Sequence, residues 1–391
     1  MKQALSYVLV TPYTVAKSRT GGIISRLLSQ VDLELVGAQM IAPNKEFVRE
    51  YAAILLEQNT AGSLTLLADY TERNFAPVGD RKRLALLLLF RGEQPCEKLS
   101  AICGHIYEEH RDLDATTAET IRDTYADLIM DPLHPELTYF EPAVMTPPDQ
   151  LWADKDLEVF ARFLKGQENI ISTPLAPDPK KRERTLVIIK PDNWQYASSK
   201  PGTIIDMFSR TGLRIVGVKV HRFSVAEALE FYGPVEAALR EKLASRFGKK
   251  AKELLEKEFG FQLSDETETA LTEHVGMEYA KDQFDQIIGF MSGIKPHDCP
   301  KEAVRQPGSV KCMILIYEGE KAIQKIRDVL GPTDPLKAPG GTVRREFGSN
   351  VMVNTAHASD SPLSAEREMR IVRIHENSLG ALITAYLAER L

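Results

Sequence analysis

The feature that most constrains the fold of this chain is an internal repeat. Two long segments share one order of features: an apolar run, a proline, a polar stretch with glycine, a helical stretch with Ile-Ile, and a second apolar run. Two shorter pairs of segments follow in the same order in both halves. The matching pairs are 6–40 with 185–220, 84–94 with 312–321, and 119–125 with 341–347. A shared order of several segments predicts a duplicated domain rather than a chance similarity.

The two copies are separated by a stretch that is rich in proline and charge. Residues 165–184 show no apolar periodicity, which is typical of a linker. We therefore expect a first domain over residues 1–168, a linker over 169–183 and a second domain over 184–391.

Within each copy, short runs rich in Val, Ile and Leu alternate with helical patterns. The short runs favour buried strands, and the spacing of Ile204, Ile205 and Phe208 favours a helix between two of them. The order strand, helix, strand, helix, strand, helix, strand predicts an α+β fold made of two tandem ferredoxin-like sandwiches. Each would have an antiparallel four-stranded sheet with helices on it, with the strand order left open.

The second copy is longer than the first by a stretch of about residues 233–275. Leu239, Leu243, Phe247 and Leu254 recur there at helical spacing, with Glu and Lys between them. The pattern predicts a helical insertion that packs one face on its domain. A helix that binds a partner or forms a lid is the alternative.

The composition is that of a globular domain without a strong basic field. The chain has 391 residues, 43% of them hydrophobic and 27% charged, and its formal net charge is −6. This balance gives no support to a nucleic-acid partner or an anionic membrane surface. No apolar run approaches the ~20 residues that span a bilayer. The four cysteines lack a disulfide or metal spacing, so we expect reduced thiols and a cytoplasmic location.

The second copy also carries five short motifs in a fixed order. They are IIKPD at 188–192, LGPTDP at 330–335, PGGTVR at 339–344, NTAHASDS at 354–361 and SAERE at 364–368. Together these segments resemble the active-site motifs of the nucleoside diphosphate kinase family, over about residues 184–368. The first copy would then be a degenerate member of the same family.

The resemblance implies a transferase that moves the terminal phosphate from a nucleoside triphosphate to a nucleoside diphosphate. His357 would be the nucleophile, forming a phosphohistidine in a ping-pong mechanism, because a neutral imidazole is nucleophilic near physiological pH. Glu368 would hold the ring nitrogen that does not attack, with Ser359 supporting that carboxylate. Lys190 would assist catalysis by placing positive charge on the phosphates.

The resemblance also implies a nucleotide-binding set for ATP and other nucleoside tri- and diphosphates. Arg327, Thr333 and Arg344 would join Lys190 on the phosphates, since a guanidinium binds phosphate oxygens in pairs. The remaining contacts would be Asn354 near the ribose, Tyr232 near the nucleophile, and Val351 and Phe284 on either side of the base. Mg²⁺ would arrive with the phosphates, and no protein metal site is expected.

Some residues depart from the family pattern. Ala358 stands where glycine is commoner, Asn193 replaces the glycine that follows IKPD, and extra residues lie between Gly293 and Pro307. These changes leave the preferred base and sugar open.

The first copy lacks most of the reactive groups. Its aligned residues are Thr11 for Lys190, Tyr13 for Asp192, Ser100 for Arg327, Val144 for His357, Arg122 for Arg344 and Asp156 near Glu368. Valine can neither attack nor be protonated, so no phosphotransfer is expected there. The copy would serve either as a built-in partner in an intrachain pseudo-dimer, or as a regulatory domain that binds nucleotide through Arg122 or docks another protein.

A non-catalytic nucleotide-binding scaffold or regulatory protein is the alternative function, and a kinase that phosphorylates protein acceptors from His357 is a third. A scaffold has no physical need for the full set of reactive residues, and the first copy illustrates their loss. That set is Lys190, Thr333, Arg344, Asn354, His357 and Glu368. A homo-oligomer of whole chains is possible, with fewer subunits expected than in single-domain relatives.

Overall fold

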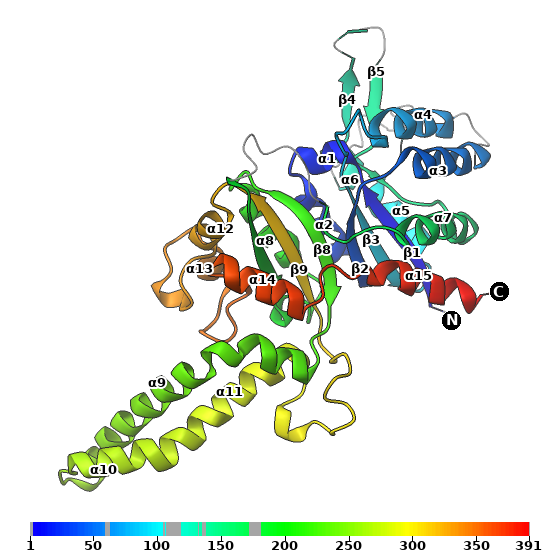
Figure 1. Cartoon of the computed structure of the whole chain (residues 1–391). Helices are drawn as coiled ribbons and strands as arrows, with labels where there is room; N and C mark the ends of the chain where they lie inside the picture. Colours follow the sequence, from blue (N-terminus) through cyan, green and yellow to red (C-terminus); the bar gives the residue numbers. More distant parts are fainter. Residues whose placement is uncertain are drawn as a thin grey trace. The chain divides into compact units, whose positions relative to one another are not determined.

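The computed structural model describes residues 3–58, 63–104, 106, 119–131, 133–134, 138–171 and 181–390. The chain divides into two compact units (Figure 1). We call residues 1–220 and 313–391 the core unit, and residues 221–312 the hairpin unit. Each unit is described by itself.

Two four-stranded sheets form the centre of the core unit, and they have the same strand order. The first sheet is ordered β2-β3-β1-β6, with β1 Ala4–Val10, β2 Glu34–Ile41, β3 Ala85–Gly92 and β6 Val144–Met145. The second is ordered β8-β9-β7-β10, with β7 Glu183–Ile189, β8 Arg214–His221, β9 Cys312–Gly319 and β10 Ala356–Ala358. In both, the first and third strands of the copy are antiparallel central neighbours. The predicted duplication of an α+β sandwich is confirmed.

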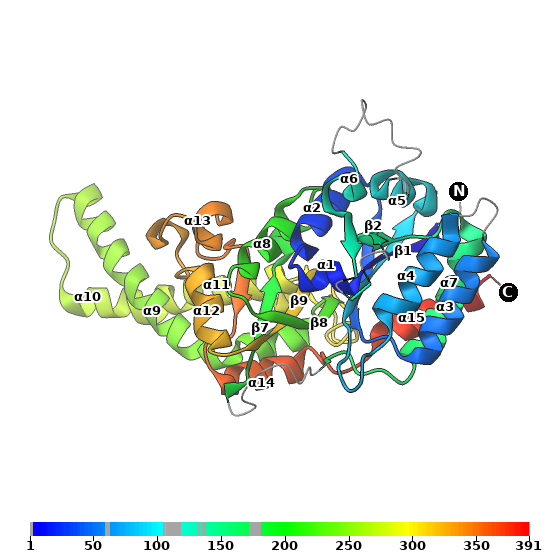
Figure 2. The same ribbon diagram turned by 90° about the horizontal axis from the view of Figure 1, so that it is seen from above.

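The helices of the first copy and a small hairpin surround the first sheet. They are α1 Pro12–Ala16, α2 Thr20–Gln30, α3 Lys45–Glu57, α4 Ser63–Phe75, α5 Pro95–Cys103, α6 Ile121–Tyr125 and α7 Gln150–Leu164, with β4 Asp127–Met130 paired to β5 Thr138–Glu141. Alternate residues of β1 point to opposite faces, as the pleat requires. Tyr7 and Leu9 contribute to one buried cluster, while Val8 and Val10 contribute to another. Figure 2 shows α3, α4 and α7 gathered on one side of this sheet.

The second copy has the equivalent helices and further short segments. In the core unit these are η4 Pro191–Asn193, α8 Lys200–Ser209, α12 Ala322–Leu330, η7 Pro335–Lys337, α13 Val343–Phe347, α14 Pro362–Ile371 and α15 Ser378–Ala388. The hairpin unit holds α9 Val225–Phe259, α10 Asp265–Ala270, the π-helix η5 Leu271–Gly276, α11 Met277–Ser292 and η6 Pro296–Asp298.

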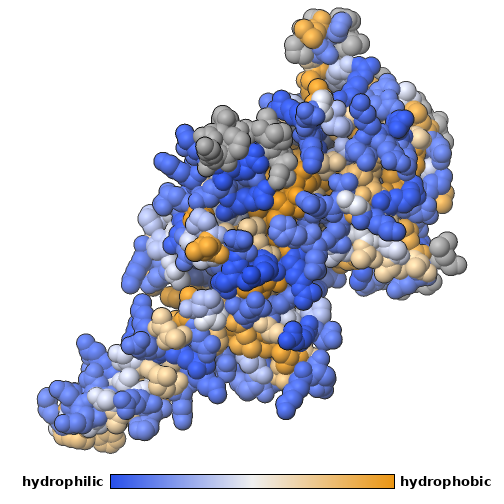
Figure 3. Space-filling view, in the orientation of Figure 1, coloured by the Kyte–Doolittle hydropathy of each residue, from blue (hydrophilic) through white to orange (hydrophobic). Residues whose placement is uncertain are grey.

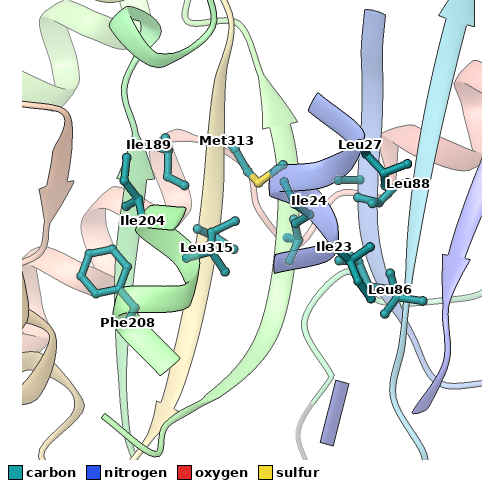
Figure 4. Close-up of a cluster of buried hydrophobic side chains, with 14 of the residues drawn as sticks. Ile23, Ile24, Leu27, Leu86, Leu88, Ile189, Ile204, Phe208, Met313 and Leu315 are labelled. Carbon is teal, nitrogen blue, oxygen red and sulfur yellow. The ribbon is translucent and has the colours of Figure 1, made fainter. Parts of the chain in front are cut away.

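The two copies meet where α2 packs against α8. One continuous apolar cluster contains Ile23 and Ile24 from α2 together with Ile204 and Phe208 from α8 (Figure 4). A continuous core of this kind stabilises the association of the copies through removal of apolar surface from water.

Two glycines allow the backbones of α2 and α8 to approach closely. A Cβ atom on Gly21 would lie 2.5 Å from the backbone N of Asp206 and 2.6 Å from the carbonyl O of Gly202. A Cβ atom on Gly202 would collide in the same way with Gly21 and Ser25. Because Gly21 and Gly202 are aligned in the repeat, as are Ser25 and Asp206, the contact is reciprocal. The copies therefore pack as a pseudo-twofold pair, as an isologous dimer would.

The last helix of the chain packs on the first copy. Leu379 and Ile383 of α15 lie in the same buried cluster as Leu157 and Phe160 of α7. Between the two helices, Asn377 Nδ2 donates to the carbonyl O of Leu164 at 2.5 Å. The domain boundaries at 168 and 184 remain a prediction, and this helix ties the end of the second copy to the core of the first.

The hairpin unit contains the predicted insertion. Its helix α9 begins at a capping box, in which the side chains of Ser224 and Glu227 each accept from the other's backbone N–H. The chain then turns back through α10 and η5 into α11, and the rings of Phe247 and Tyr279 lie 5.0 Å apart between the two long helices. The sequence predicted helical structure here, and the structure shows that it is a helical hairpin.

The face of the molecule seen in Figure 3 is largely polar, with scattered apolar patches. In the part of the chain that the structure describes, we find no helix with the length and apolar character needed to cross a bilayer.

Candidate active site

The strand β10 and the helix α14 bring three of the predicted residues into contact. Nε2 of His357 lies 3.0 Å from Oε2 of Glu368, and Ser359 Oγ donates to the same carboxylate oxygen at 2.7 Å. Ser359 is fully buried and Glu368 is 4% exposed, whereas the His357 side chain keeps 22% of its surface exposed. The imidazole is therefore accessible, while the groups that hold it are not.

Local structure fixes these positions. His357 pairs with Ile188 in the antiparallel ladder of β7 and β10. Ser361 caps α14 by accepting from the backbone N of Ser364, which sets Glu368 on the buried face of that helix. Thr355, just before β10, has a φ of 74°, a left-handed conformation that is uncommon for a β-branched residue.

Lys190 lies directly after β7, within hydrogen-bonding distance of the residues that precede His357. Its backbone N donates to the carbonyl O of Thr355 at 2.9 Å, and its Nζ donates to Asn354 Oδ1 at 2.7 Å. Burial and, to a smaller extent, the nearby Arg344 guanidinium together lower the pKa of Lys190 to about 8, against the opposing effect of Asp192. A phosphate beside this ammonium would favour its charged form.

Asn354 connects Lys190 to the segment that carries Thr333 and Val351. Its Nδ2 donates to the carbonyl O of Val351 at 2.8 Å and to that of Thr333 at 3.2 Å. The Val351 side chain is 57% exposed, and Thr333 is also exposed. These two side chains are available to a ligand, in keeping with their predicted roles.

The two predicted arginines differ in their surroundings. Arg344 donates to the carbonyl O of Gly331 at 3.0 Å and to that of Ala356, the neighbour of His357, at 3.1 Å. Arg327 is exposed on α12. Hydrogen bonds from Ser364 and Ser361, together with the charge of Arg327, lower the pKa of the Asp360 carboxyl. Arg344 is thus bonded to the backbone beside His357, whereas Arg327 is exposed to solvent.

Tyr232 and Phe284 lie in the hairpin unit. The ring of Tyr232 contacts Phe231, with centroids 5.2 Å apart. Phe284 is 1% exposed, and the guanidinium of Arg240 lies 5.6 Å from its ring centroid. Their predicted roles at the nucleotide remain predictions.

Two residues that the sequence analysis did not assign also support the site. Asn193 Nδ2 donates to the carbonyl O atoms of Lys190 and Thr355, at 2.9 and 2.8 Å. Lys219, 8% exposed, donates to the carbonyl O atoms of Val372 and Arg373 at the end of α14. The signal for Lys219 was a lysine inside an apolar strand. Asn193 was visible only as a replacement for glycine.

The strand register of the first copy corrects one alignment. Leu9 is equivalent to Ile188, the partner of His357, and Leu9 pairs with Met145 rather than with Val144. Met145 therefore occupies the nucleophile position, and the expectation for Val144 was wrong by one residue. The error arose because an apolar segment without a recognisable motif gives no marker for register.

Arg122 repeats the bonds of Arg344. It donates to the carbonyl O of Gly104 and, at 2.9 Å, to that of Val144, which are the equivalents of Gly331 and Ala356. Arg122 is 3% exposed. These bonds give Arg122 a structural role, and binding of a nucleotide through it remains a prediction.

Asp156 stands at the place of Glu368, eleven residues after Met145 as Glu368 is after His357. It accepts from the hydroxyl of Tyr7 at 2.8 Å, and that hydroxyl is also 2.8 Å from the hydroxyl of Tyr51. Burial raises the pKa of Asp156 to about 7. The first copy therefore has a buried carboxyl group at this position, and it is hydrogen-bonded to Tyr7, which contacts Tyr51.

The comparisons with known proteins match the second copy of the chain. The family model for nucleoside diphosphate kinase matches residues 183–239 and 235–377, all in the second copy. A nucleoside diphosphate kinase of Halorhodospira halophila is 30% identical over 187 residues, covering 48% of this chain and 89% of the relative. One from Staphylothermus marinus is 31% identical over 190 residues, covering 49% and 92%.

Among solved structures, an NDP kinase from Pyrobaculum aerophilum is 27% identical and covers 49% of this chain and 94% of its own, with a TM-score of 0.34. The sequence matches cover nearly the whole length of the two curated relatives at 30% identity or more. This chain belongs to the nucleoside diphosphate kinase family.

Proposed function

We propose that the second copy transfers the terminal phosphate of a nucleoside triphosphate to a nucleoside diphosphate through a phosphohistidine at His357. The observation that carries the proposal is the contact of His357 with Glu368 and, through it, with Ser359. A partly exposed imidazole held by a buried carboxylate has the form of an activated nucleophile.

The contact also assigns the two ring nitrogens. A carboxylate only accepts, so Nε2 of His357 carries the proton that faces Glu368, and the lone pair lies on Nδ1. In the first half-reaction a bond forms between Nδ1 and the γ-phosphorus, and the bond from that phosphorus to the β,γ-bridging oxygen breaks. The nucleoside diphosphate leaves with that electron pair. A second nucleoside diphosphate then attacks the phosphoryl group and restores the imidazole.

Charge on the transferred group would be stabilised by Lys190, Arg327 and Arg344, with the Thr333 hydroxyl as a further donor. Lys190 carries this role best, because it is buried beside Asn354 and already bonded to the strand of the nucleophile. The described residues contain no cluster of three or more His, Cys, Asp or Glu side chains that could hold a metal. We propose that Mg²⁺ is part of the substrate, bound to the nucleotide phosphates. Asn354, Val351, Tyr232 and Phe284 are the proposed contacts of the nucleoside.

For the first copy we propose a structural role. The thioether of Met145 cannot take the proposed role of the His357 imidazole, and the uncharged Thr11 cannot supply the positive charge of Lys190. Its packing through α2 and α7 supports the second copy as a partner subunit would.

The test is incubation of the full chain with γ-labelled ATP and Mg²⁺, followed by a chase with unlabelled GDP. We expect an acid-labile, alkali-stable phosphoprotein whose label passes to GTP. His357→Ala should abolish the label, while His375→Ala, an exposed histidine in the same region, should retain it. If ATP binds and no phosphoprotein forms, the chain is a nucleotide-binding scaffold. If the label passes to a protein and not to GDP, it is a protein kinase.

A further inference from the structure

A cavity lies within the core unit, and His357 is not among its lining residues. It has a volume of about 680 Å³. The first copy contributes α1, the end of α4 and the segment before β3, and the second copy contributes α8, the turn into β8 and Tyr317 of β9. Its size is within the range of pockets that hold small organic ligands. We call it the seam cavity.

The apolar part of the seam cavity comes from both copies. Val15 and Met40 line it from the first copy, and Ile205 and Ile215 from the second. Figure 3 shows apolar surface beside α1, between the two copies. A ligand with an apolar body would gain from burial against this wall.

Positive charge is concentrated on the same cavity. Arg81, Lys82 and Arg83 line it from one segment of the first copy, and Arg214 from the second copy, while no Asp or Glu is among the described lining residues. Within the described chain, none of Arg81, Lys82 and Arg214 forms an ion pair. Burial and the charge of Arg81 lower the pKa of Arg83 from its ordinary value. Unpaired cations facing one cavity favour an anion with more than one negative charge.

The basic segment is held in place by a tight turn. Val78 and Arg81 exchange backbone hydrogen bonds of 3.1 and 3.0 Å around Gly79, whose φ of 57° suits a glycine. The guanidinium of Arg83 donates to the carbonyl O of Arg73 at 2.5 Å. The cations therefore project from an ordered turn.

A buried hydroxyl gives an independent indication of a ligand. Tyr317 lines the cavity and is 1% exposed, and its hydroxyl has no hydrogen-bond partner among the described residues. A buried hydroxyl without a partner is unfavourable by about 1–3 kcal/mol in general. A polar atom of a bound molecule would satisfy it.

We propose that the seam cavity binds a phosphorylated organic ligand, with its phosphate on the Arg81–Lys82–Arg214 side and its apolar body against the wall of Val15 and Ile215. Because the lining residues come from both copies, binding requires that the two copies are packed together. A nucleoside phosphate and a smaller phosphate ester share this chemistry. The site is separate from the proposed kinase site, since it shares no residue with it.

The variant Arg214→Glu tests the proposal with little risk to folding. Arg214 is exposed at the start of β8, and the equivalent position at the start of β2 is Glu34. Arg49→Glu, at an exposed position on α3 outside the cavity, is the matched charge control. A second variant, Ala16→Trp, fills the mouth of the cavity from an exposed position on α1 without changing charge.

The experiment is equilibrium dialysis of the full chain with radiolabelled GDP, counting sites per chain. We expect two sites in the unmodified chain and in Arg49→Glu, and one site in Arg214→Glu and Ala16→Trp, with affinity at the lost site at least about tenfold weaker. If GDP fills one site in all four proteins, ribose 5-phosphate is the second probe, read by thermal stabilisation. Stabilisation that disappears in Arg214→Glu and Ala16→Trp assigns the cavity to a smaller phosphate ester.

The proposal would be overturned if neither GDP nor ribose 5-phosphate showed binding that is lost in Arg214→Glu. Phosphotransfer at saturating ATP and GDP is measured on the same samples and should be equal in Arg214→Glu and the unmodified chain. Loss of phosphotransfer in every sample, with the second site intact, would defeat the proposed function and leave the seam site standing.

Discussion

Oε2 of Glu368 lies 3.0 Å from Nε2 of His357 and accepts from Ser359 Oγ at 2.7 Å. One buried carboxylate oxygen therefore orients the imidazole while being held itself. Because the carboxylate accepts from Nε2, the proposed mechanism assigns the attack to Nδ1.

The first prediction concerns this carboxylate. Glu368→Gln keeps the shape of the side chain but removes the charge that stabilises the imidazole's proton position, so phosphoenzyme formation should slow by roughly 100-fold. Rapid-quench measurement with labelled ATP gives the rate. Glu366→Gln, on the exposed face of the same helix, is the control and should react at the unmodified rate. Equal rates for the two variants would remove Glu368 from the mechanism.

The second prediction concerns the charge on Lys190. Its pKa of about 8, lowered mainly by burial, means that the side chain is protonated below pH 8 and neutral above it. The affinity for ADP should therefore fall by about three- to tenfold between pH 8 and pH 9. Lys190→Arg keeps its charge over this range and should bind with a flatter profile. Titration calorimetry at several pH values measures the affinity for ADP, with Lys325→Arg as the control. If the affinity of Lys190→Arg falls with pH as steeply as that of the unmodified chain, the pH dependence does not come from Lys190.

The third prediction concerns the contact of α2 with α8. Gly21→Ala places a Cβ atom 2.5 Å from the backbone N of Asp206, so the helices must move apart, and the core unit should lose about 1–3 kcal/mol. Gly233→Ala, in α9 with no atom within 4 Å of the added Cβ, should be neutral or stabilising. Urea unfolding followed by tryptophan fluorescence reports on the core unit, which holds both Trp152 and Trp194. Equal midpoints for the two variants would exclude a tight backbone contact.

The fourth prediction concerns Arg122 in the first copy. Arg122→Leu leaves the carbonyl groups of Gly104 and Val144 without their donor and should destabilise the chain by about 2–3 kcal/mol. Thermal unfolding measures the loss, and Arg49→Leu at an exposed position should leave the midpoint unchanged. A normal midpoint for Arg122→Leu together with weaker nucleotide binding would favour the regulatory role of this arginine.

The fifth prediction concerns the buried carboxyl of Asp156. Burial raises its pKa to about 7 in the folded chain, above the value of about 4 expected when unfolded. Its stabilising contribution is complete below pH 4 and is lost as the pH rises through 7. Asp156→Asn, which never ionises, should therefore raise the free energy of unfolding at pH 8 by on the order of 2 kcal/mol.

Unfolding midpoints between pH 5 and pH 8 test this fifth prediction. The exposed Glu158→Gln on the same helix is the control and should keep the pH dependence of the unmodified chain. Some dependence will remain in Asp156→Asn, because burial also raises the pKa of Glu141 to about 7. A destabilised Asp156→Asn at pH 8 would show that the ionised carboxylate is the favoured partner of Tyr7.

The sequence alone determined the duplication and the fold class, and its resemblance to the family implied the contact of His357 with Glu368. The apolar runs and the polar stretches between them recur in both halves, and local patterns of this kind specify strands and helices directly. His357 and Glu368 are eleven residues apart, so a strand and the helix that follows it suffice to bring them together. The loss of reactive groups in the first copy followed from residue types.

The tertiary structure decided what depends on residues distant in the sequence. Pairing with β1 placed Met145 rather than Val144 at the nucleophile position, because register is set by the neighbouring strand and a slip of one residue reverses the faces. The bonds of Arg122 to Gly104 and Val144 also depend on the tertiary structure, and packing on α7 placed α15 with the first copy. The seam cavity is formed by segments of both copies. It exists only where the two copies pack together, so no local sequence pattern in either copy predicts it.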